Sequence, residues 1–226
     1  EVTAAARDGG GRYYLGTSHE VYGPAVMVSD DLENWRQIEN GPKYDPGTPG
    51  NADHQRIAGL FEMPGEAPRT GRQLDQIWTF HVSGDSVYAG VSEAGLFRSD
   101  DRGETWQPIG GLNDHPERGE WGPGAGGLCT HAVLSDPQDP QRMWVGISAV
   151  GVLRTDDGGA TWEGKNEGVS KFYGYCVHGL AHDPDDASVI FRQDHRGMYK
   201  TTSGGDSWEL IETGLPMRTV GGQHRA

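Results

Sequence analysis

The sequence is poor in cysteine, in long apolar runs and in basic residues. Its 226 residues include two cysteines, too few for the disulfide framework of a small secreted domain. No apolar run approaches the roughly 20 residues of a membrane-spanning helix, so we expect no membrane insertion. No signal peptide is visible from Glu1 onward. Both the cytosol and a secreted location stay open, with the cytosol marginally favoured.

Positive charge is scarce as well. Lys and Arg number 19 against 33 Asp and Glu, which gives a formal net charge of −14. This balance argues against nucleic-acid binding, which needs clustered basic side chains. It also disfavours anionic substrates, unless a local basic pocket overrides the overall field. The sequence has no P-loop, dinucleotide-binding fingerprint or nucleophile elbow either.

Glycine is plentiful, and one short glycine-containing phrase recurs. The chain has 36 glycines and 13 prolines, as expected for many turns. The phrase stands at residues 29–35 (SDDLENW), 99–106 (SDDRGETW), 155–162 (TDDGGATW) and 201–208 (TTSGGDSW). Each copy follows a β-rich run and ends in Trp before a second short β-like run. This pattern predicts a hairpin with the phrase at its turn.

Each residue of the phrase has a structural role in such a hairpin. An Asp at the third position, such as Asp101 or Asp157, can accept backbone N–H groups within the turn. Gly supplies positive φ, and the Trp side chain can pin the hairpin onto its sheet. The recurring carboxylates are therefore interpreted as structural. The fourth copy has Ser203 in place of Asp and the first lacks Gly, so we expect these two turns to be held less tightly.

The phrase resembles the Asp-box, or BNR repeat, of sialidases and many other β-propellers. Residues 94–106, with 111–116 (GLNDHP) and 126–131 (GGLCTH), resemble a bacterial glycosyl hydrolase-type branch of the sialidase-like proteins. The resemblance implies a β-propeller fold and suggests exo-sialidase-type hydrolysis. Related Asp-box propellers include photosystem assembly factors and sorting-receptor ectodomains, which bind rather than catalyse.

The resemblance does not supply a sialidase site. Sialidases use an arginine triad, a Tyr/Glu nucleophile pair, an Asp acid/base and an Arg-Ile-Pro-type motif. Here Arg56-Ile57 is followed by Ala58, and neither the triad nor the nucleophile pair can be assigned residue by residue. Hydrolase activity therefore rests on resemblance alone, and a shared fold does not imply a shared function.

Internal repeats predict an all-β propeller of four-stranded antiparallel blades. Residues 128–137 (LCTHAVLSDP) align with 175–184 (YCVHGLAHDP) at an offset of 47 residues, close to the period of about 40–50 residues for propeller blades. We expect a single domain over 1–226, with blades at about 1–39, 76–109, 128–164 and 176–211. Four blades are few for closure, which favours a fragment of a larger propeller.

Two insertions interrupt the repeats, at 40–75 and 110–127. Both are rich in Gly, Pro and polar residues, and long loops of this kind are often lids or binding loops. Each joins the last strand of one blade to the first of the next, so both belong to the blade end opposite the Asp-boxes. A glycan, another small ligand or a protein could bind there. The alternative is that both segments are surface insertions that the fold tolerates without a function.

The connections between second and third strands should bring polar residues to that same end. Glu20, Glu93 and Asp194 come from three different blades, and paired carboxylates across a cleft would suit glycoside hydrolysis. His19, Arg196 and Trp121 are candidates for substrate binding. Carboxylates on solvated loops are common, however, and a non-catalytic binding or assembly scaffold is the alternative.

A Cys-x-His pair begins the first strand of two blades, at Cys129/His131 and Cys176/His178. Residues two apart on a strand share a face, and innermost strands of adjacent blades approach one axis. With His195 added, His131 and His178 predict a divalent metal site, and zinc fits these ligand types best. The alternative is that both cysteines are small buried strand residues and that the histidines bond to backbone at blade junctions.

Overall fold

Four antiparallel sheets of four strands each make up most of the described chain. The structure is a computed structural model that describes residues 1–19, 21–50, 71–124, 126–171 and 175–211. Within each sheet the strands pair in sequence order. Sheet 1 consists of β1 (Val2–Arg7), β2 (Tyr13–His19), β3 (Gly23–Ser29) and β4 (Arg36–Gln37). Sheet 2 consists of β5 (Ile77–Ser83), β6 (Ser86–Val91), β7 (Gly95–Ser99) and β8 (Gln107–Pro108). Sheet 3 consists of β9 (Thr130–Ser135), β10 (Met143–Ile147), β11 (Gly151–Thr155) and β12 (Glu163–Gly164). Sheet 4 consists of β13 (Val177–His182), β14 (Ile190–Asp194), β15 (Gly197–Thr201) and β16 (Glu209–Ile211).

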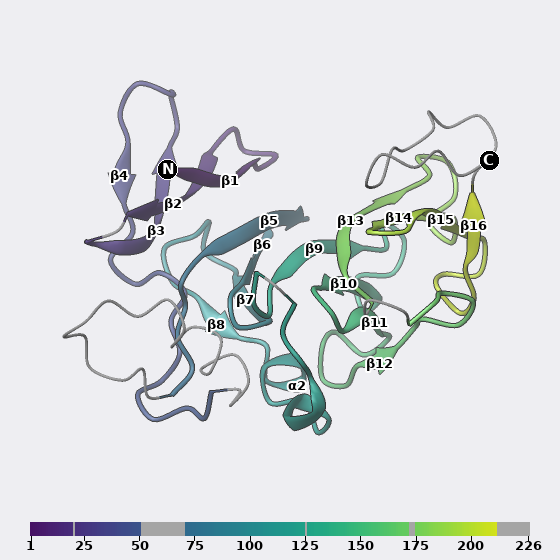
Figure 1. Cartoon of the computed structure of the whole chain (residues 1–226). Helices are drawn as coiled ribbons and strands as arrows, with labels where there is room; N and C mark the ends of the chain where they lie inside the picture. The colour runs from purple at the N-terminus through teal and green to yellow at the C-terminus, as the bar shows by residue number, and fades with distance from the viewer. Residues whose placement is uncertain (20, 51–70, 125, 172–174, 212–226) are drawn as a thin grey trace, which may run out of the picture.

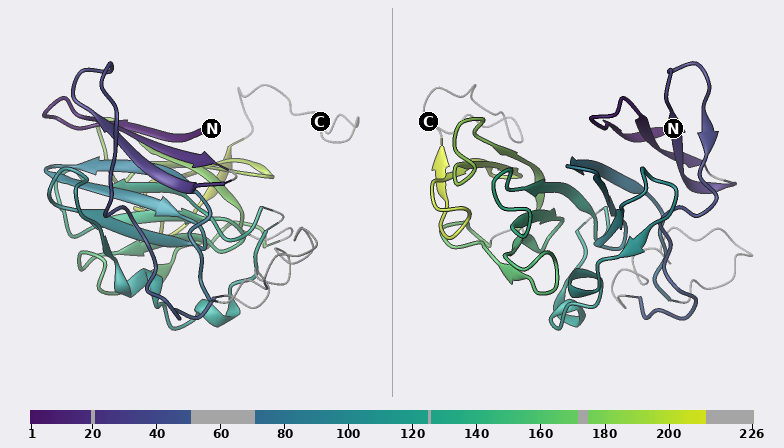
Figure 2. Two further views of the ribbon diagram at one scale, coloured as in Figure 1. Left: turned by 90° about the vertical axis from the view of Figure 1, so that its left-hand side faces the viewer. Right: turned by 180° about the vertical axis from the view of Figure 1, so that it is seen from behind.

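The sheets lie side by side in an open arc. Their first strands contact one another in turn, β1 with β5, β5 with β9, and β9 with β13. Figure 1 shows sheet 1 and sheet 4 at opposite ends of this arc, and the view from behind in Figure 2 agrees. Among the described elements, then, the first strands line the inside of the curve and the short fourth strands lie outside it.

Burial follows position in the arc. The second strands of the two middle sheets, β6 and β10, are buried along nearly their whole length, because each middle sheet has a neighbour on both faces. The second strands of the end sheets, β2 and β14, instead alternate buried and more exposed residues, the pattern of a strand covered on one face. This difference is what an open row of four sheets predicts.

Three apolar cores fill the spaces between neighbouring sheets. Tyr14 of sheet 1 packs with Phe80 and Phe97 of sheet 2. Leu96 shares a second cluster with Val145 of sheet 3. The third cluster, between sheets 3 and 4, includes Trp144, Ile190 and Tyr199. These face-to-face layers hold the sheets together, since sheet faces with large apolar side chains interdigitate when stacked.

The recurrent turns, at residues 29–35, 99–106, 155–162 and 201–208, join third and fourth strands as hairpins. Asp157 accepts hydrogen bonds from Thr161 N (2.8 Å), Thr161 Oγ1 (2.6 Å) and Thr155 Oγ1 (2.7 Å). In the fourth turn the Oγ of Ser203 accepts from Ser207 N at 3.3 Å, a longer contact that agrees with the looser hold expected there.

The first turn compensates for its missing glycine. Leu32 adopts a φ of 65°, and the Asp31 carboxylate accepts from the backbone and side chain of Asn34, both at 2.7 Å. Trp35 stays half-buried, whereas Trp106 and Trp162 are buried. This turn therefore keeps its Asp-centred bonds although its Trp is less well covered.

The second insertion is a packed segment. It contains a helical turn α2 (Gly110–Asn113) and a 3₁₀ turn η1 (Arg118–Glu120). Leu112 is completely buried, and Asn113 Oδ1 accepts the Leu96 N–H at 2.8 Å. His115 Nε2 lies 3.1 Å from the Trp162 carbonyl of sheet 3. The segment thus bridges sheets 2 and 3. The first insertion falls mostly outside the described residues. No described helix is long and apolar enough to cross a membrane.

Candidate functional site

All four first strands contain an irregularity at the same place. In each pairing of first and second strands the register shifts across one residue near the start, which is left without a ladder partner. Such a bulge re-aims the side chain that it carries. The four residues are Thr3, Trp78, His131 and His178. The fold therefore presents one equivalent bulge residue from every sheet.

Two further positions accompany each bulge residue. The ladder pairs Val177 with Asp194 and Thr130 with Ile147, so the residue two before each bulge lies opposite a residue at the end of the second strand, or directly after it. Each sheet therefore has a triplet of positions. It consists of the residue two before the bulge, the bulge residue itself, and the residue of the second strand's end that lies opposite the first of these. The four triplets are Glu1/Thr3/Ser18, Gln76/Trp78/Ser92, Cys129/His131/Ser148 and Cys176/His178/His195.

The triplets of sheets 2 and 3 close on a serine hydroxyl. Trp78 Nε1 donates to Ser92 Oγ at 3.1 Å, and His131 Nε2 lies 2.7 Å from Ser148 Oγ. Cys129 Sγ donates to the carbonyl of Gly126 at 3.2 Å. The bulge residue thus has a hydroxyl partner in its own sheet, and Cys129 bonds to the loop that precedes β9.

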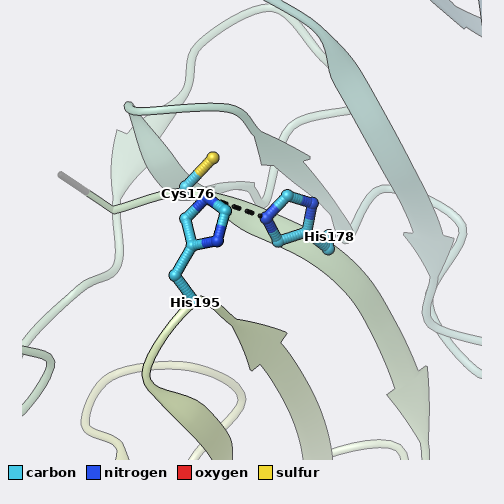
Figure 3. Close-up of side chains that lie close together, drawn as sticks. All are labelled: Cys176, His178 and His195. Atoms are coloured by element: carbon cyan, nitrogen blue, oxygen red, sulfur yellow. Dashed lines mark hydrogen bonds between the residues drawn. The ribbon is translucent and has the colours of Figure 1, made fainter. Parts of the chain in front are cut away.

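The triplet of sheet 4 brings three metal-ligand types together. The Cys176 Sγ and one ring nitrogen each from His178 and His195 all lie within 4.8 Å of one another. Figure 3 shows the two imidazoles close together with the thiol beside them, and the ring planes meet at 75° in a T-shaped contact. The His178 and His195 Nε2 atoms are 3.2 Å apart. Cys176 is buried, while both histidines are exposed, so the cluster is reachable from solvent.

A row of rings connects this cluster to sheets 2 and 3. The ring centroids of Trp78 and His131 are 4.7 Å apart, those of His131 and His178 5.6 Å, and those of His178 and His195 4.4 Å. The row follows β5, β9 and β13 along the inside of the arc. Its members become more exposed from half-buried Trp78 and His131 to His178 and His195.

Burial shifts the pKa values of Cys129 and His131 in sheet 3. Burial, with a smaller effect from His178, lowers the pKa of His131 to about 4. Burial also raises the pKa of the Cys129 thiol to about 12, and the nearby Cys176 adds to the rise. Removing a thiol proton at this depth is unfavourable because the thiolate loses its hydration. Cys129 is therefore protonated at neutral pH.

The predicted carboxylates are engaged elsewhere or lie outside the described part. Glu93 is 2% exposed and Asp194 3%. The Asp194 carboxylate accepts the Arg196 N–H at 2.7 Å and lies 3.6 Å from the fully buried guanidinium of Arg192. Glu20 falls outside the described residues. The structure thus places Glu93 and Asp194 in the interior.

The predicted substrate-binding residues divide between surface and core. His19 is exposed at the end of β2; its Nδ1 accepts the Val21 N–H at 3.0 Å, and its ring lies 4.9 Å from that of Tyr22. Arg196 is exposed after β14. Trp121 is 6% exposed, within the core cluster between sheets 2 and 3. His19 and Arg196 are accessible, but Trp121 is not.

The fold is similar to that of several solved structures. No family model and no curated protein matches the sequence. Among solved structures, an ancestral GH74 enzyme superposes with a TM-score of 0.61 at 13% identity, over 95% of this chain and 24% of that enzyme. A GH74 enzyme from Niastella koreensis gives a TM-score of 0.57 at 17% identity, over 94% and 30%. YCF48 from Cyanidioschyzon merolae gives 0.55 at 14% identity, over 96% and 58%.

The fold is a partial β-propeller. All three structures have propeller folds, and the four radial sheets confirm the expected architecture. This chain spans about a quarter of the ancestral GH74 enzyme and somewhat over half of YCF48. At identities this low the likeness concerns the fold alone, so a GH74 or YCF48 function does not follow from it.

The sequence hypothesis grouped His131, His178 and His195. The structure brings His178 and His195 together, places His131 on Ser148, and adds Cys176 to the cluster. Trp78 in the equivalent position of sheet 2 was missed, because no Cys-x-His pattern marks it. The pairing of first and second strands, counted from the hairpin turn, would place His195 opposite Cys176. The bulge at His178 leaves no signal in the sequence.

Proposed function

We propose that this chain is the ligand-binding part of a larger Asp-box β-propeller, and that it binds a glycan without hydrolysing it. The site would be the loop end, defined as the end that carries the bulges and the connections between second and third strands. The observation that carries the proposal is that several ring side chains gather there, on β5, β9, β13 and the loop after β14, with Tyr22 at the corresponding end of sheet 1.

Ring side chains suit a sugar ligand for a physical reason. The C–H face of a pyranose packs against an aromatic face, while imidazole and hydroxyl groups exchange hydrogen bonds with sugar hydroxyls. Tyr22 is 85% exposed, and His178 and His195 are exposed. A neutral glycan is also compatible with the net charge of −14, which would repel most anionic ligands.

Binding without hydrolysis is supported by the state of the carboxylates. Glycoside hydrolysis needs two carboxyl groups that both reach the scissile bond. Glu93 and Asp194 are both almost fully buried, and Asp194 faces the buried Arg192. Asp-box membership is supported by the turns themselves, in which Asp31, Asp101 and Asp157 each accept the backbone N–H of the residue that precedes the Trp.

The test is a glycan array followed by calorimetry, in the presence of a chelator so that binding does not depend on metal. A double Tyr22→Ala, Trp78→Ala variant should lose the glycans that the parent binds. The matched control is Trp35→Ala, which removes a half-buried indole from the opposite, turn end and should leave binding unchanged. Absence of any glycan binding by the parent, or equal loss in both variants, would refute the proposal.

Hydrolysis of a glycan is the second candidate, raised by the two GH74 enzymes that share the fold. Release of reducing sugar from a panel of polysaccharides would be measured for the parent and for Glu93→Gln and Asp194→Asn. Our proposal expects no release from any of them. Release that disappears in either variant, at an unchanged melting temperature, would replace binding by catalysis.

A further inference from the structure

We propose that Cys176, His178 and His195 form a binding site for a divalent transition-metal ion, with zinc as the best match. The site shares His178 and His195 with the proposed glycan-binding end, but it goes beyond that function, and metal binding is measured without a glycan. A thiolate and two imidazoles are borderline-soft ligands that favour Zn²⁺ over Mg²⁺ or Ca²⁺. Three protein ligands would leave a fourth tetrahedral position for water or for an oxygen atom of a ligand.

The spacing of the ring nitrogens fits such an ion. Zinc–nitrogen bonds of about 2.0–2.1 Å at a tetrahedral centre place two nitrogens about 3.3–3.4 Å apart. The His178 and His195 Nε2 atoms are 3.2 Å apart, and all three ligand atoms lie within 4.8 Å of one another. The two imidazoles are therefore already about one tetrahedral edge apart. The Cys176 sulfur, within 4.8 Å of both nitrogens, would move closer to reach a zinc–sulfur bond of about 2.3 Å.

The fold prepares this geometry from two strands. Cys176 precedes Val177, whose ladder partner Asp194 precedes His195, so the cysteine and His195 lie opposite each other at the sheet end. Cross-strand neighbours of this kind share a face. The bulge at His178 adds the third ligand beside them. Both strands are anchored by buried residues, Val177 and Ile190, which favours a preorganised site.

The other sheets provide an internal comparison. Sheet 3 repeats the cysteine and the bulge histidine, but Ser148 stands where sheet 4 has His195, and its hydroxyl takes His131 Nε2. Sheet 2 has Ser92 at that position and sheet 1 has Ser18. Of these four described triplets, only that of sheet 4 has a ligand type at each position. Replacing the serine by a histidine is the change that distinguishes it.

The experiment uses tag-free, reduced protein with Zn²⁺ and Co²⁺ as probes. Equilibrium dialysis with plasma mass spectrometry gives the stoichiometry, and Co²⁺ reports a thiolate ligand by its charge-transfer absorption. The parent should bind a single ion of either metal per chain, and Co²⁺ should show the thiolate band. His195→Ser, which installs the residue of sheets 2 and 3, and Cys176→Ser should each lose binding at micromolar metal.

Cys129→Ser is the matched control, because it removes the equivalent cysteine of sheet 3. It should keep both the stoichiometry and the cobalt–thiolate band. Circular dichroism of each variant checks that the sheets persist, and His195→Ser covers the case in which Cys176→Ser fails to fold. A parent that binds no ion, or binding that survives in His195→Ser, would overturn the site. The 3.2 Å contact would then be a hydrogen bond between two imidazoles.

Discussion

Asp157 shows how a single side chain holds a recurrent turn. Hydrogen bonds from the Thr161 hydroxyl, the Thr161 backbone N–H and the Thr155 hydroxyl lower the pKa of Asp157 to about 2. All of these donors stabilise the ionised form. The carboxylate lies on the surface, so its contribution comes from closing the turn and not from apolar burial.

We therefore predict that Asp157→Ala lowers the melting temperature by a few degrees, on the order of 2–4 °C. Asp157→Ser copies the fourth turn, in which the Ser203 hydroxyl accepts a longer bond, and should fall between parent and Ala variant. Differential scanning calorimetry checks the order. Equal melting temperatures for all three proteins would contradict it.

The same side chain gives a pH dependence with a definite sign. The folded pKa of about 2 lies below the ordinary value of 3.8. The ionised form is therefore favoured by folding, and its contribution is fully present above pH 3.8 and lost as the pH falls toward 2. The stability gap between parent and Asp157→Ala, measured by urea unfolding, should narrow across this window. A gap that widens on acidification would contradict the assignment.

At the scale of elements, the recurrent turns also join neighbouring sheets. Gly103, in the turn of sheet 2, has a φ of 85°, and a Cβ added there would lie 2.8 Å from Tyr14 Cε1 of sheet 1. Tyr14 is fully buried, so its ring has little room to move. The turn can approach sheet 1 this closely because the position carries no side chain.

Gly103→Ala should destabilise the fold by on the order of 2 kcal/mol or more, because left-handed backbone strain and overpacking add. Gly84→Ala is the matched control: Gly84 has a φ of 58° and nothing within 4 Å of an added Cβ, so about 1 kcal/mol is expected from the backbone alone. Urea unfolding of both variants measures the difference. Equal losses would mean that the Tyr14 contact carries no cost.

The elements were predictable from sequence to the extent that local patterns define them. Alternating apolar runs and the recurrent turn phrase predicted hairpins, and the hairpins formed. The bulges at Trp78 and His131 were not predictable, because a register shift depends on pairing with another strand and leaves no composition signal. Since the bulges position the ring row and the Cys176/His178/His195 cluster, the sequence could indicate that His178 and His195 lie close together but not that His131 bonds to Ser148.

The segment 110–127 marks a second limit of sequence reasoning. Its Gly- and Pro-rich composition suggested a lid, a binding loop or a tolerated insertion, and the binding role stays a prediction. The composition did not indicate that Leu112 and Trp121 are buried or that Arg118 donates to the carbonyls of Glu93 and Ala94. Composition reports turns, but it does not report where apolar and cationic side chains find partners. Tertiary packing decided that this segment bridges two sheets.

At the scale of the whole molecule, the sequence repeats predicted the fold class. They did not predict which contacts hold neighbouring sheets together. Neighbouring sheets share an apolar core, and charged side chains at the turn end add contacts across the junctions. Arg12 of sheet 1 donates to Glu104 Oε1 at 2.7 Å and to the Arg102 carbonyl at 3.2 Å, both in sheet 2. Arg154 of sheet 3 likewise reaches Asp206 of sheet 4 at 2.9 Å.

This arrangement predicts that damage at one junction stays local. Stability in a row of repeats is approximately a sum of repeat and nearest-neighbour terms, so a junction at one end should have little influence on the other. The Arg12 side chain is 13% exposed and also pairs with Asp30 of its own sheet at 2.9 Å. Arg12→Ala removes all of these bonds and leaves Glu104 with Arg36 as its remaining described ion-pair partner.

Hydrogen exchange measured by mass spectrometry should therefore show faster exchange in β1–β3 of Arg12→Ala, with β13–β16 unchanged, because local opening follows the loss of nearby contacts. Arg142→Ala is the matched control, since Arg142 pairs with Asp136 and Asp156 inside sheet 3. It should leave sheet 1 protected. Faster exchange in all four sheets of Arg12→Ala would instead mean that the arc unfolds as one cooperative unit, and the nearest-neighbour account would fail.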